Sequence, residues 1–326
     1  MASLMFLSAC GSLDSSEGSA DGKPNVAVFL SASANAFEQA QLAGVEAAAK
    51  DFDGGQVTAF DGAFDSTKQV AQIQDAVTSG GFDVFVIEPV DAVAVVPALK
   101  SAAAKNIKVV CMFVACGPDP SSLDKQFDGQ AGVVAMNFEQ VATVLATSAI
   151  DACADKRPCK VAYLNGDVTF TSDRLALDSV NSAFKTPEAD GITLVASQDG
   201  KYDAATSRKA VQDMFQRDPD IDVLVSYSDQ QTQGAVQALQ AIGRFGNVKI
   251  ISNGATEAAV EAVRNGTYFS EGASVPRSWG YKAGEIGIKL AQGNDVSETS
   301  INTSDLSPVG GLINQQNVSN FTAEYK

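Results

Sequence analysis

Residues 26–50 read VAVFLSASANAFEQAQLAGVEAAAK, and this stretch decides the fold class. It begins with five apolar residues, 26–30, whose unbroken apolarity is typical of a strand buried on both faces of a parallel sheet. A short polar loop follows, and the Ala-rich residues 38–50 predict a helix. A strand, a loop and a helix form the repeating unit of α/β proteins, so we expect an α/β fold.

The same unit recurs along the chain in two series of similar spacing. The first series has expected strands at 26–30, 57–61, 83–87 and 107–113 with a helix at 66–79, and the second has strands at 159–164, 192–197, 221–226 and 247–252 with helices at 203–216 and 229–243. One sheet of that many strands would twist beyond easy closure. The pattern therefore predicts two Rossmann-like lobes, each a parallel sheet flanked by helices.

The connections between the lobes are also visible in the composition. Residues 117–132 are polar and rich in turn residues, and they predict the first link between the lobes. After the second series come an expected strand at 268–273 and a helix near 280–292. These elements and the polar tail would unbalance the second lobe if all belonged to it, so we expect the lobes to exchange more than one segment.

Composition and charge exclude several classes of function. Of the 326 residues, 45% are hydrophobic and 19% charged, which suits a folded chain with a large core. The 23 Lys and Arg stand against 39 Asp and Glu, and a net charge of −16 would repel a phosphate backbone. The chain has no histidine, which excludes His-based catalytic triads and His-ligated zinc. A nucleotide-binding glycine motif is absent too, so we expect no nucleic acid, no metal and no cofactor.

The amino terminus has the composition of an export signal. Residues 1–10 read MASLMFLSAC, and a Ser-, Gly- and Asp-rich stretch follows to about Lys23. LSAC resembles the lipoprotein box of bacteria, which implies that Cys10 carries the lipid anchor. No basic residue precedes the short apolar run, so we expect residues 1–24 to be a truncated lipoprotein signal and a flexible tether; a non-native leader is the alternative.

The other four cysteines form two close pairs, Cys111 with Cys116 and Cys153 with Cys159. An even number of cysteines at short spacing in an exported chain predicts two disulfides. A metal site is the alternative, but the pairs lie far apart in the sequence and no histidine assists them. Both spacers are longer than in a C-x-x-C redox motif, so disulfides are the preferred interpretation.

Several stretches resemble the type I periplasmic sugar-binding proteins, in particular the ribose-binding branch that serves ABC importers. They are the opening stretch already quoted, FDSTKQVAQIQDAVTSGGFDVFVIEPVDAVAVVPALKSAAAKNIKVV (64–110), DPDIDVLVSYSDQQTQGAVQALQAIG (218–243) and VEAVRNGTYFSEGASVPRSWGYKAGEIGIKLAQG (260–293). The resemblance implies two lobes, three crossing segments and a ligand enclosed between them. Carried over, lobe one would be 25–133 plus 277–303, and lobe two 134–276 plus 304–326.

The resemblance also implies a function without chemistry. The chain would be an exported cell-surface or periplasmic lipoprotein, a monomer held at the membrane by its lipid alone. It would capture a small sugar, polyol or related ligand and deliver it to an ABC permease. In open α/β sheets, ligands sit beyond the carboxyl ends of the strands, which is where the two lobes would face each other.

In the first lobe, the resemblance places four ligand residues after the first strand: Ser31, Asn35, Phe37 and Glu38. An aromatic face covers the C–H face of a sugar, and Asn offers a donor and an acceptor to hydroxyls. Asn35 and Phe37 have an ordinary turn and helix start as their alternative. Glu38 stands where the family has an aromatic residue.

In the second lobe, the resemblance implies three contacts. Arg174 occupies the position of a sugar-binding arginine, allowing a one-residue gap, and its alternative is a surface arginine paired with Asp173 or Asp178. Tyr202 matches an aromatic ligand position, with a core role at a strand end as its alternative. Ser228 is the aligned contact, whereas we interpret its neighbour Asp229 as a helix cap.

Three departures from the ribose branch concern the ligand. Phe113 and Val114 stand in place of an Asp-Arg pair, Gly254 beside Asn253 replaces a ligand aspartate, and Ser274 replaces a ligand glutamine. These changes remove charged acceptors for sugar hydroxyls. We infer a ligand other than ribose, with fewer hydroxyls or an apolar face. Phe113 would then line the pocket, with burial in the core as the alternative.

Two other classes of function fit the sequence less well. A transcriptional regulator of the same fold needs a basic DNA-binding head, whereas the first 24 residues contain one lysine. An enzyme would need an acid and a base, for which Glu88 and Asp91 are conceivable carboxylates. Nothing else in the sequence supports chemistry, so we expect no enzyme. An effector-binding sensor of the same fold remains the nearer alternative.

Overall fold

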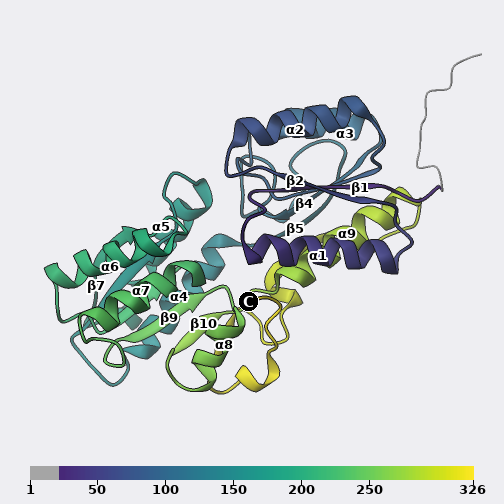
Figure 1. The fold of residues 1–326 in the computed structure, drawn as a ribbon. Helices are drawn as coiled ribbons and strands as arrows, with labels where there is room; N and C mark the ends of the chain where they lie inside the picture. Colours follow the sequence, from purple (N-terminus) through teal and green to yellow (C-terminus); the bar gives the residue numbers. More distant parts are fainter. Residues whose placement is uncertain (1–21) are drawn as a thin grey trace, which may run out of the picture.

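The computed structural model describes residues 22–326, which form two lobes, each built on a six-stranded sheet between helices (Figure 1). The predicted two-lobed α/β fold is confirmed. The predictions for Cys10, and for the signal and tether in residues 1–21, lie outside the described residues.

The first sheet has the strand order β11-β5-β4-β3-β1-β2, and all its neighbours pair in parallel. Its strands are β1 (Val26–Leu30), β2 (Val57–Asp61), β3 (Val84–Ile87), β4 (Lys108–Phe113), β5 (Gln130–Ala135) and β11 (Ser300–Asn302). Its helices are α1 (Ala36–Asp51), α2 (Ser66–Ser79), α3 (Val96–Ala104) and α9 (Pro276–Ala291).

Helices on both faces explain the apolar strands of this sheet. Along β1, Val26, Val28 and Leu30 share a core with α1 and α9. Ala27 and Phe29 point the other way, into a core with α2 and α3. Because alternate side chains of a strand face opposite sides, a strand covered twice must be apolar at every position.

The second sheet has the order β12-β10-β9-β8-β6-β7 and repeats this arrangement. Its strands are β6 (Cys159–Asn165), β7 (Ile192–Asp199), β8 (Val223–Ser226), β9 (Lys249–Asn253), β10 (Ser270–Gly272) and β12 (Leu312–Asn314), the last antiparallel to β10. Its helices are α4 (Phe138–Ala152), α5 (Thr171–Ala183), α6 (Ala204–Arg217), α7 (Asp229–Ala241) and α8 (Glu257–Arg264), and short 3-10 helices lie at Pro187–Ala189, Thr303–Leu306 and Val318–Asn320.

The chain passes between the two sheets three times. The first crossing follows β5 and leads to the second sheet. The second follows β10 and returns to the first sheet, and the third follows β11 and leads to β12 of the second sheet. The prediction that residues 117–132 form the first link is wrong, because β5 begins within them and pairs with β4 and β11 in the first sheet. The crossing comes after Ala135 instead. The lobe limits inferred from the resemblance stay predictions.

Helices α1 and α9 pack closely in the first lobe (Figure 1). Gly44 of α1 faces the backbone of Arg277 and Tyr281, and Gly280 of α9 faces the backbone of Gln41. A Cβ at either glycine would overlap that backbone, so only glycine permits this approach. The close packing fixes the start of α9 next to the start of α1, beside the site described below.

Both predicted disulfides are present. One joins Cys111, in β4, to Cys116, and the other joins Cys153, at the end of α4, to Cys159, at the start of β6. All four cysteines are buried. A search of residues 22–326 for a helix long and apolar enough to cross a membrane finds none.

Candidate functional site

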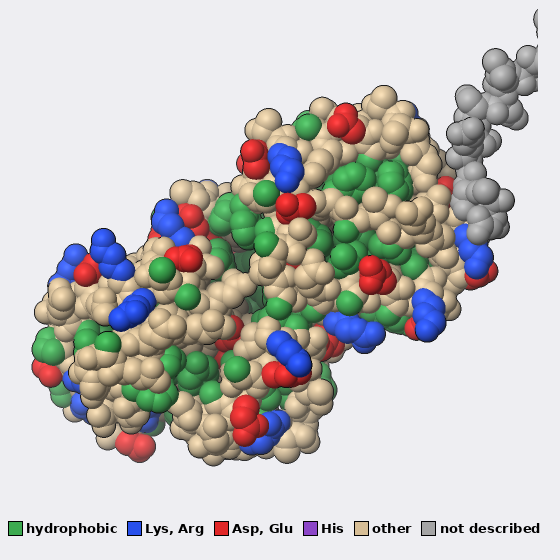
Figure 2. Space-filling model, viewed as in Figure 1, with side chains coloured by type: hydrophobic (Ala, Val, Ile, Leu, Met, Phe, Trp, Pro, Cys, Tyr) green, Lys and Arg blue, Asp and Glu red, His purple; other side chains and the backbone are tan. Residues whose placement is uncertain are grey.

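A cavity of about 270 Å³ lies between the lobes, and the surface is visibly hollowed there (Figure 2). Its walls come from loops at the carboxyl ends of strands in both sheets, where α/β proteins bind ligands. Nine of the ten predicted ligand residues line it: Ser31, Asn35, Phe37, Glu38, Phe113, Tyr202, Ser228, Asn253 and Ser274. The tenth, Arg174, does not.

Asn35 sets the start of α1 at the cavity wall. It is the N-cap of the helix, and its Oδ1 accepts hydrogen bonds from the backbone N–H groups of Phe37 and Glu38, each at 3.1 Å. Such a cap satisfies backbone donors that have no partner inside the helix. Asn35 is therefore both the cap of the helix and a residue of the cavity wall. The cap holds Phe37 and Glu38 in the first turn of the helix.

An aromatic cluster forms part of the wall. The Phe37 ring contacts Phe113, Trp279 and Tyr325 edge-on, with ring centroids 5.3, 5.6 and 5.7 Å apart. Phe113 also stacks on Trp279, at 5.6 Å and an interplanar angle of 12°. The backbone of Phe113 has a φ of 65°, a conformation that is unfavourable for a bulky residue. Stacking on Trp279 and edge contacts with Phe37 and Phe138 hold Phe113 in that conformation at the cavity wall.

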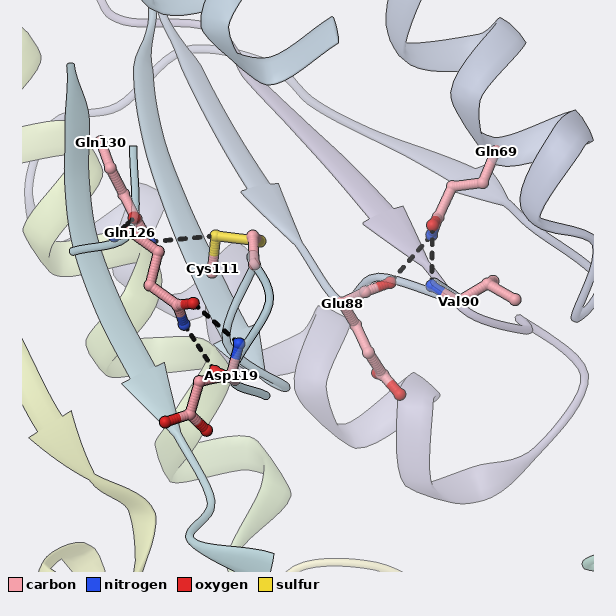
Figure 3. Close-up of a disulfide and its surroundings, with 8 residues drawn as sticks. Gln69, Glu88, Val90, Cys111, Asp119, Gln126 and Gln130 are labelled. Carbon is pink, nitrogen blue, oxygen red and sulfur yellow. Dashed lines mark hydrogen bonds between the residues drawn. A yellow bond between two sulfur atoms is a disulfide. The ribbon is translucent and has the colours of Figure 1, made fainter. Parts of the chain in front are cut away.

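Two buried carboxyl groups meet at one hydroxyl group in the first lobe. Ser31 Oγ lies 3.2 Å from Glu38 Oε1 and 2.9 Å from Glu88 Oε1. Glu88 follows β3, and Gln69 of α2 fixes the backbone there by donating to the Glu88 carbonyl and accepting from Val90 N, both at 2.8 Å (Figure 3). The Glu88 side chain extends away from Gln69 (Figure 3). All three members of the group line the cavity.

Burial changes the acidity of this pair. It raises the pKa of Glu38 to about 9, and repulsion from Glu88 adds to that rise. Burial also raises the pKa of Glu88 to about 7, although hydrogen bonds from the Ser31 hydroxyl and the Gln41 side chain lower it in part. Because burial disfavours the charged form of both groups and Glu88 repels a charged Glu38, the pair retains a proton at neutral pH.

A third buried carboxyl group, Asp173, lies on the opposite wall. It accepts hydrogen bonds from the Tyr202 hydroxyl at 2.9 Å and from Asp167 N at 2.5 Å. Burial raises the pKa of Asp173 to about 6 despite these donors. The predicted contact Tyr202 lines the cavity, and its hydroxyl points to Asp173. The backbone φ of Tyr202 is 53°.

The start of α7 corrects one detail. The prediction that Asp229 is a helix cap is wrong, because Ser228 is the N-cap of α7 and Asp229 is the first helical residue. The Asp229 carboxylate instead accepts from Ser252 Oγ at 2.6 Å and from Thr256 N at 2.8 Å. It thereby ties α7 to the loop after β9. Asp229 also lines the cavity, as Ser228 does.

Arg174 stabilises a loop instead of facing the cavity. Its guanidinium donates to the Val168 and Thr169 carbonyls, at 2.8 and 3.1 Å, and to Thr171 Oγ1, at 2.8 Å. Thr169 and Thr171 themselves line the cavity. Contact between Arg174 and a ligand stays a prediction.

Several cavity residues were not predicted as ligand contacts. The most prominent are Glu88, Phe138, Phe170, Asp173, Tyr227, Asp229 and Tyr325. For Glu88 a signal was present, since it is a charged residue directly after the buried strand VFVI. For Tyr325 none was, because its place depends on how the carboxyl-terminal tail returns to the cavity.

Comparison with known proteins identifies the family. Residues 26–295 match the family described as "Periplasmic binding protein domain". The chain belongs to the periplasmic binding protein family. Among its relatives, the D-ribose/D-allose-binding protein of Pseudomonas aeruginosa is 26% identical over 271 residues, which cover 80% of this chain and 81% of that protein.

Solved structures of periplasmic binding proteins share the fold. A solute-binding protein from Actinobacillus succinogenes, with bound D-allose, has a TM-score of 0.79 at 19% identity and covers 92% of this chain and 100% of its own. One from Mycobacterium smegmatis, with bound glycerol, has a TM-score of 0.77 at 24% identity, covering 93% and 99%. The expected sugar-binding resemblance is confirmed, and the family is one of exported binding proteins, which are not enzymes.

The carboxylates considered for an enzyme occupy different surroundings. Asp91 is exposed, and its Oδ1 accepts from the backbone N–H groups of Val93 and Ala94, each at 2.9 Å. This is an Asx turn that shapes the loop. Glu88 is buried beside Glu38 and Ser31. The arrangement is that of a binding wall in which the polar groups are fixed before a ligand arrives.

Proposed function

We propose that this periplasmic binding protein captures a small sugar or polyol between its lobes and presents it to an ABC permease. The observation that carries the proposal is the cavity, whose polar and aromatic walls come from both lobes. Sugars need this combination, because aromatic faces cover their C–H surfaces and side chains exchange hydrogen bonds with their hydroxyls. The nine predicted residues that line the cavity are the proposed contacts.

The mechanism requires binding and no covalent step. A ligand that touches both lobes favours the closed arrangement by its difference in affinity for the closed and open forms. Three chain crossings allow the lobes to move as rigid bodies about a hinge. A permease that recognises the closed form then receives loaded protein in preference to empty protein.

The identity of the solute is constrained by the aromatic cluster. Relatives include proteins named for ribose and allose, and one solved neighbour holds glycerol. In this chain Phe113 stands at the wall where the ribose branch has a charged residue, so we propose a ligand other than ribose with an apolar face. Phe37 and Phe113 would cover that face.

We also propose that the protein is a monomeric lipoprotein anchored through Cys10. The LSAC sequence and the polar stretch that follows it support this assignment. Replacing Cys10 by Ser in the exporting cell should move the protein from the membrane fraction to the soluble fraction. Unchanged membrane association would contradict the anchor while leaving the binding function intact.

The binding proposal is tested by a thermal-shift screen of neutral sugars, polyols, sugar acids and amino sugars, followed by calorimetry. A ligand that binds only the folded protein raises its melting temperature. We expect Phe37→Ala to weaken the best ligand by about tenfold or more, the size typical of a buried aromatic contact. Phe52→Ala, at the other end of α1 and outside the cavity, is the matched control. A screen without any saturable binder would contradict the proposed function.

A further inference from the structure

The carboxyl-terminal tail, residues 321–326, lies between the lobes beside the cavity (Figure 1). It follows β12 and the 3-10 helix Val318–Asn320, which packs against α8 in the second lobe. The match to the family ends at residue 295, so the tail lies beyond the matched region. Tyr325, near its end, nevertheless lines the cavity. The contacts that hold the tail therefore bear on the binding site.

Glu324 holds the tail to the first lobe. Its carboxylate accepts hydrogen bonds from the Ser278 backbone N–H, at 2.9 Å, and from the Ser278 hydroxyl, in the first turn of α9. Val275, the N-cap of α9, has an apolar side chain that cannot accept a hydrogen bond from this turn. Glu324 thus supplies a cap that the sequence around the helix start does not provide, and its negative charge is favourable at that end of a helix.

Tyr325 holds the tail to the second lobe. Its backbone carbonyl accepts from Glu257 N, at the start of α8, at 3.0 Å, and its hydroxyl donates to the Gly254 carbonyl at 2.8 Å. Gly254 has a φ of 145°, and a Cβ there would lie 2.8 Å from the Tyr325 hydroxyl oxygen, so glycine permits this approach. The Tyr325 ring meanwhile lies edge-on against Phe37 of the first lobe, with centroids 5.7 Å apart.

These two attachments cannot move far apart, because they belong to adjacent residues. Consecutive Cα atoms are only about 3.8 Å apart. A movement that separated the start of α9 from the start of α8 by much more than the reach of these two residues would break one set of hydrogen bonds. The tail therefore favours rotations of the lobes about an axis close to it, in which the Tyr325 ring stays against Phe37.

We infer that residues 321–326 form a fourth, noncovalent connection between the lobes, and that Tyr325 is a positioning residue that holds Phe37 at the ligand wall. The inference rests on the proposed function and adds the residue that places its main aromatic contact. Phe113 and Trp279, which also contact the Phe37 ring, belong to the first lobe as Phe37 does. Tyr325 is the ring neighbour that the second lobe holds, so the position of that lobe reaches Phe37 through Tyr325.

Hydrogen exchange of the ligand-free protein, followed by mass spectrometry, tests the connection without any ligand. Tyr325→Ala should speed exchange about tenfold or more at the start of α1 and at the start of α8, because local opening there becomes easier. Glu324→Ala should do so at the start of α9 and also at the start of α8, which Glu324 itself does not bond. Tyr325→Phe keeps the ring and removes the hydroxyl, so it should show a smaller change of the same kind if Tyr325→Ala fails to fold.

Tyr281→Ala is the matched control. The Tyr281 ring also packs against a phenylalanine beside α1, Phe52, with centroids 5.8 Å apart, and its hydroxyl donates to Asp51. This pair lies at the other end of α1, and neither ring lines the cavity. Tyr281→Ala should therefore leave exchange at the starts of α1 and α8 unchanged.

A double-mutant cycle on affinity separates positioning from direct contact. The probe is whichever of D-allose, myo-inositol and glycerol binds most tightly by calorimetry, since structural neighbours hold these compounds. Tyr325→Ala should weaken its binding about fivefold or more, and the double variant Phe37→Ala/Tyr325→Ala should bind about as weakly as Phe37→Ala alone. Tyr281→Ala should keep the affinity of the unaltered protein.

The outcomes distinguish the inference from the function on which it rests. Unchanged exchange at the start of α1 in Tyr325→Ala overturns the positioning role, and unchanged exchange at the start of α8 in Glu324→Ala overturns the connection. Losses of affinity that multiply in the double variant give Tyr325 a contact of its own and also overturn positioning. Full affinity in Tyr325→Ala together with a loss in Phe37→Ala overturns the inference and leaves solute binding established.

Discussion

At the scale of single residues, the cavity departs from an ordinary protein interior by holding acidic side chains out of water. Burying a carboxylate costs several kcal/mol unless a charge or hydrogen bonds compensate it. Asp229 is compensated by Ser252 and Thr256, and its two oxygens both have partners. Glu38 and Glu88 share the Ser31 hydroxyl, and the Gln41 side chain also hydrogen-bonds Glu88, but burial still raises the pKa of both carboxyl groups, so part of this cost remains.

This cost predicts an unusual dependence of stability on pH. The folded-state pKa values of Glu38 and Glu88, about 9 and about 7, exceed that of an unfolded glutamate, so the folded protein binds more protons above pH 4.5. The free energy of unfolding should therefore fall as the pH rises from 5 to 8, by about 1 kcal/mol or more. Asp173, with a pKa raised to about 6, acts in the same direction.

Chemical denaturation of the ligand-free protein at pH 5 and pH 8 measures this difference. The chain has no histidine, so no imidazole titrates in the window. Carboxylates with a lowered pKa, such as Asp218, lose their contribution only at lower pH. Glu38→Gln should reduce the loss, whereas Glu46→Gln should keep it. A free energy of unfolding that is constant or rises between these pH values would speak against a neutral, buried carboxyl pair.

Part of this site could be predicted from the sequence. The resemblance to sugar-binding proteins predicts Ser31, Asn35, Phe37 and Glu38 as ligand residues, since they follow the first strand and align with the first ligand loop of that family. That Glu88 joins them depends on β1 pairing with β3 in a register that sets Phe29 opposite Ile87. The next residues along each strand then lie at the same sheet edge. Register is a tertiary property, and periodicity along the sequence does not contain it.

At the scale of elements, a disulfide and a hydrogen bond hold the end of β4 and the loop after it next to the aromatic cluster. The Cys111–Cys116 disulfide encloses Phe113, and Gln130 of β5 donates to Cys111 Sγ at 3.3 Å (Figure 3). The Cys153–Cys159 disulfide closes a loop of similar length between α4 and β6, and no residue of 153–159 lines the cavity, whereas Phe113 and Val114 of the first loop do. The two disulfides thus form a matched pair, with one beside the site and one away from it.

Removing each disulfide by a double Cys→Ala substitution should separate stability from binding. Both double variants should lose stability, by about 2 kcal/mol on the loop-entropy account. Only Cys111→Ala/Cys116→Ala should also weaken ligand binding, because Phe113 then has freedom to leave its φ of 65°. Urea denaturation and calorimetry on the two variants check this. Equal affinity in both would show that packing on Trp279 alone holds Phe113.

The elements that the sequence predicted share a simple physical origin. The expected strands 26–30 and 57–61 and the helix 66–79 coincide with β1, β2 and α2, because each has a clear apolar pattern between turn residues. β5 was missed because it begins with Gln130, Ala131 and Gly132, which have weak strand preference. Its pairing with β4 and β11 determines it, and that pairing depends on residues 300–302 far along the chain.

At the scale of the whole molecule, the carboxyl-terminal tail connects the lobes beside the cavity (Figure 1). The Glu324 carboxylate accepts from the Ser278 backbone N at 2.9 Å and from the Ser278 hydroxyl, at the start of α9. The Tyr325 ring packs against Phe37, while its hydroxyl donates to the Gly254 carbonyl of the second lobe at 2.8 Å. Adjacent residues of the tail thus bind different lobes next to the ligand cavity.

Ligand binding should bring the lobes closer together. A ligand in contact with the walls of both lobes stabilises the arrangement in which those contacts are simultaneous, and the three crossings permit rotation without unfolding either sheet. We expect the radius of gyration from small-angle X-ray scattering to decrease when saturating ligand is added. Phe37→Ala should need a higher ligand concentration for the same decrease, and Phe52→Ala should match the unaltered protein. An unchanged radius of gyration at calorimetric saturation would mean that the lobes already adopt their final arrangement before the ligand binds, so that the permease distinguishes loaded from empty protein by something other than closure.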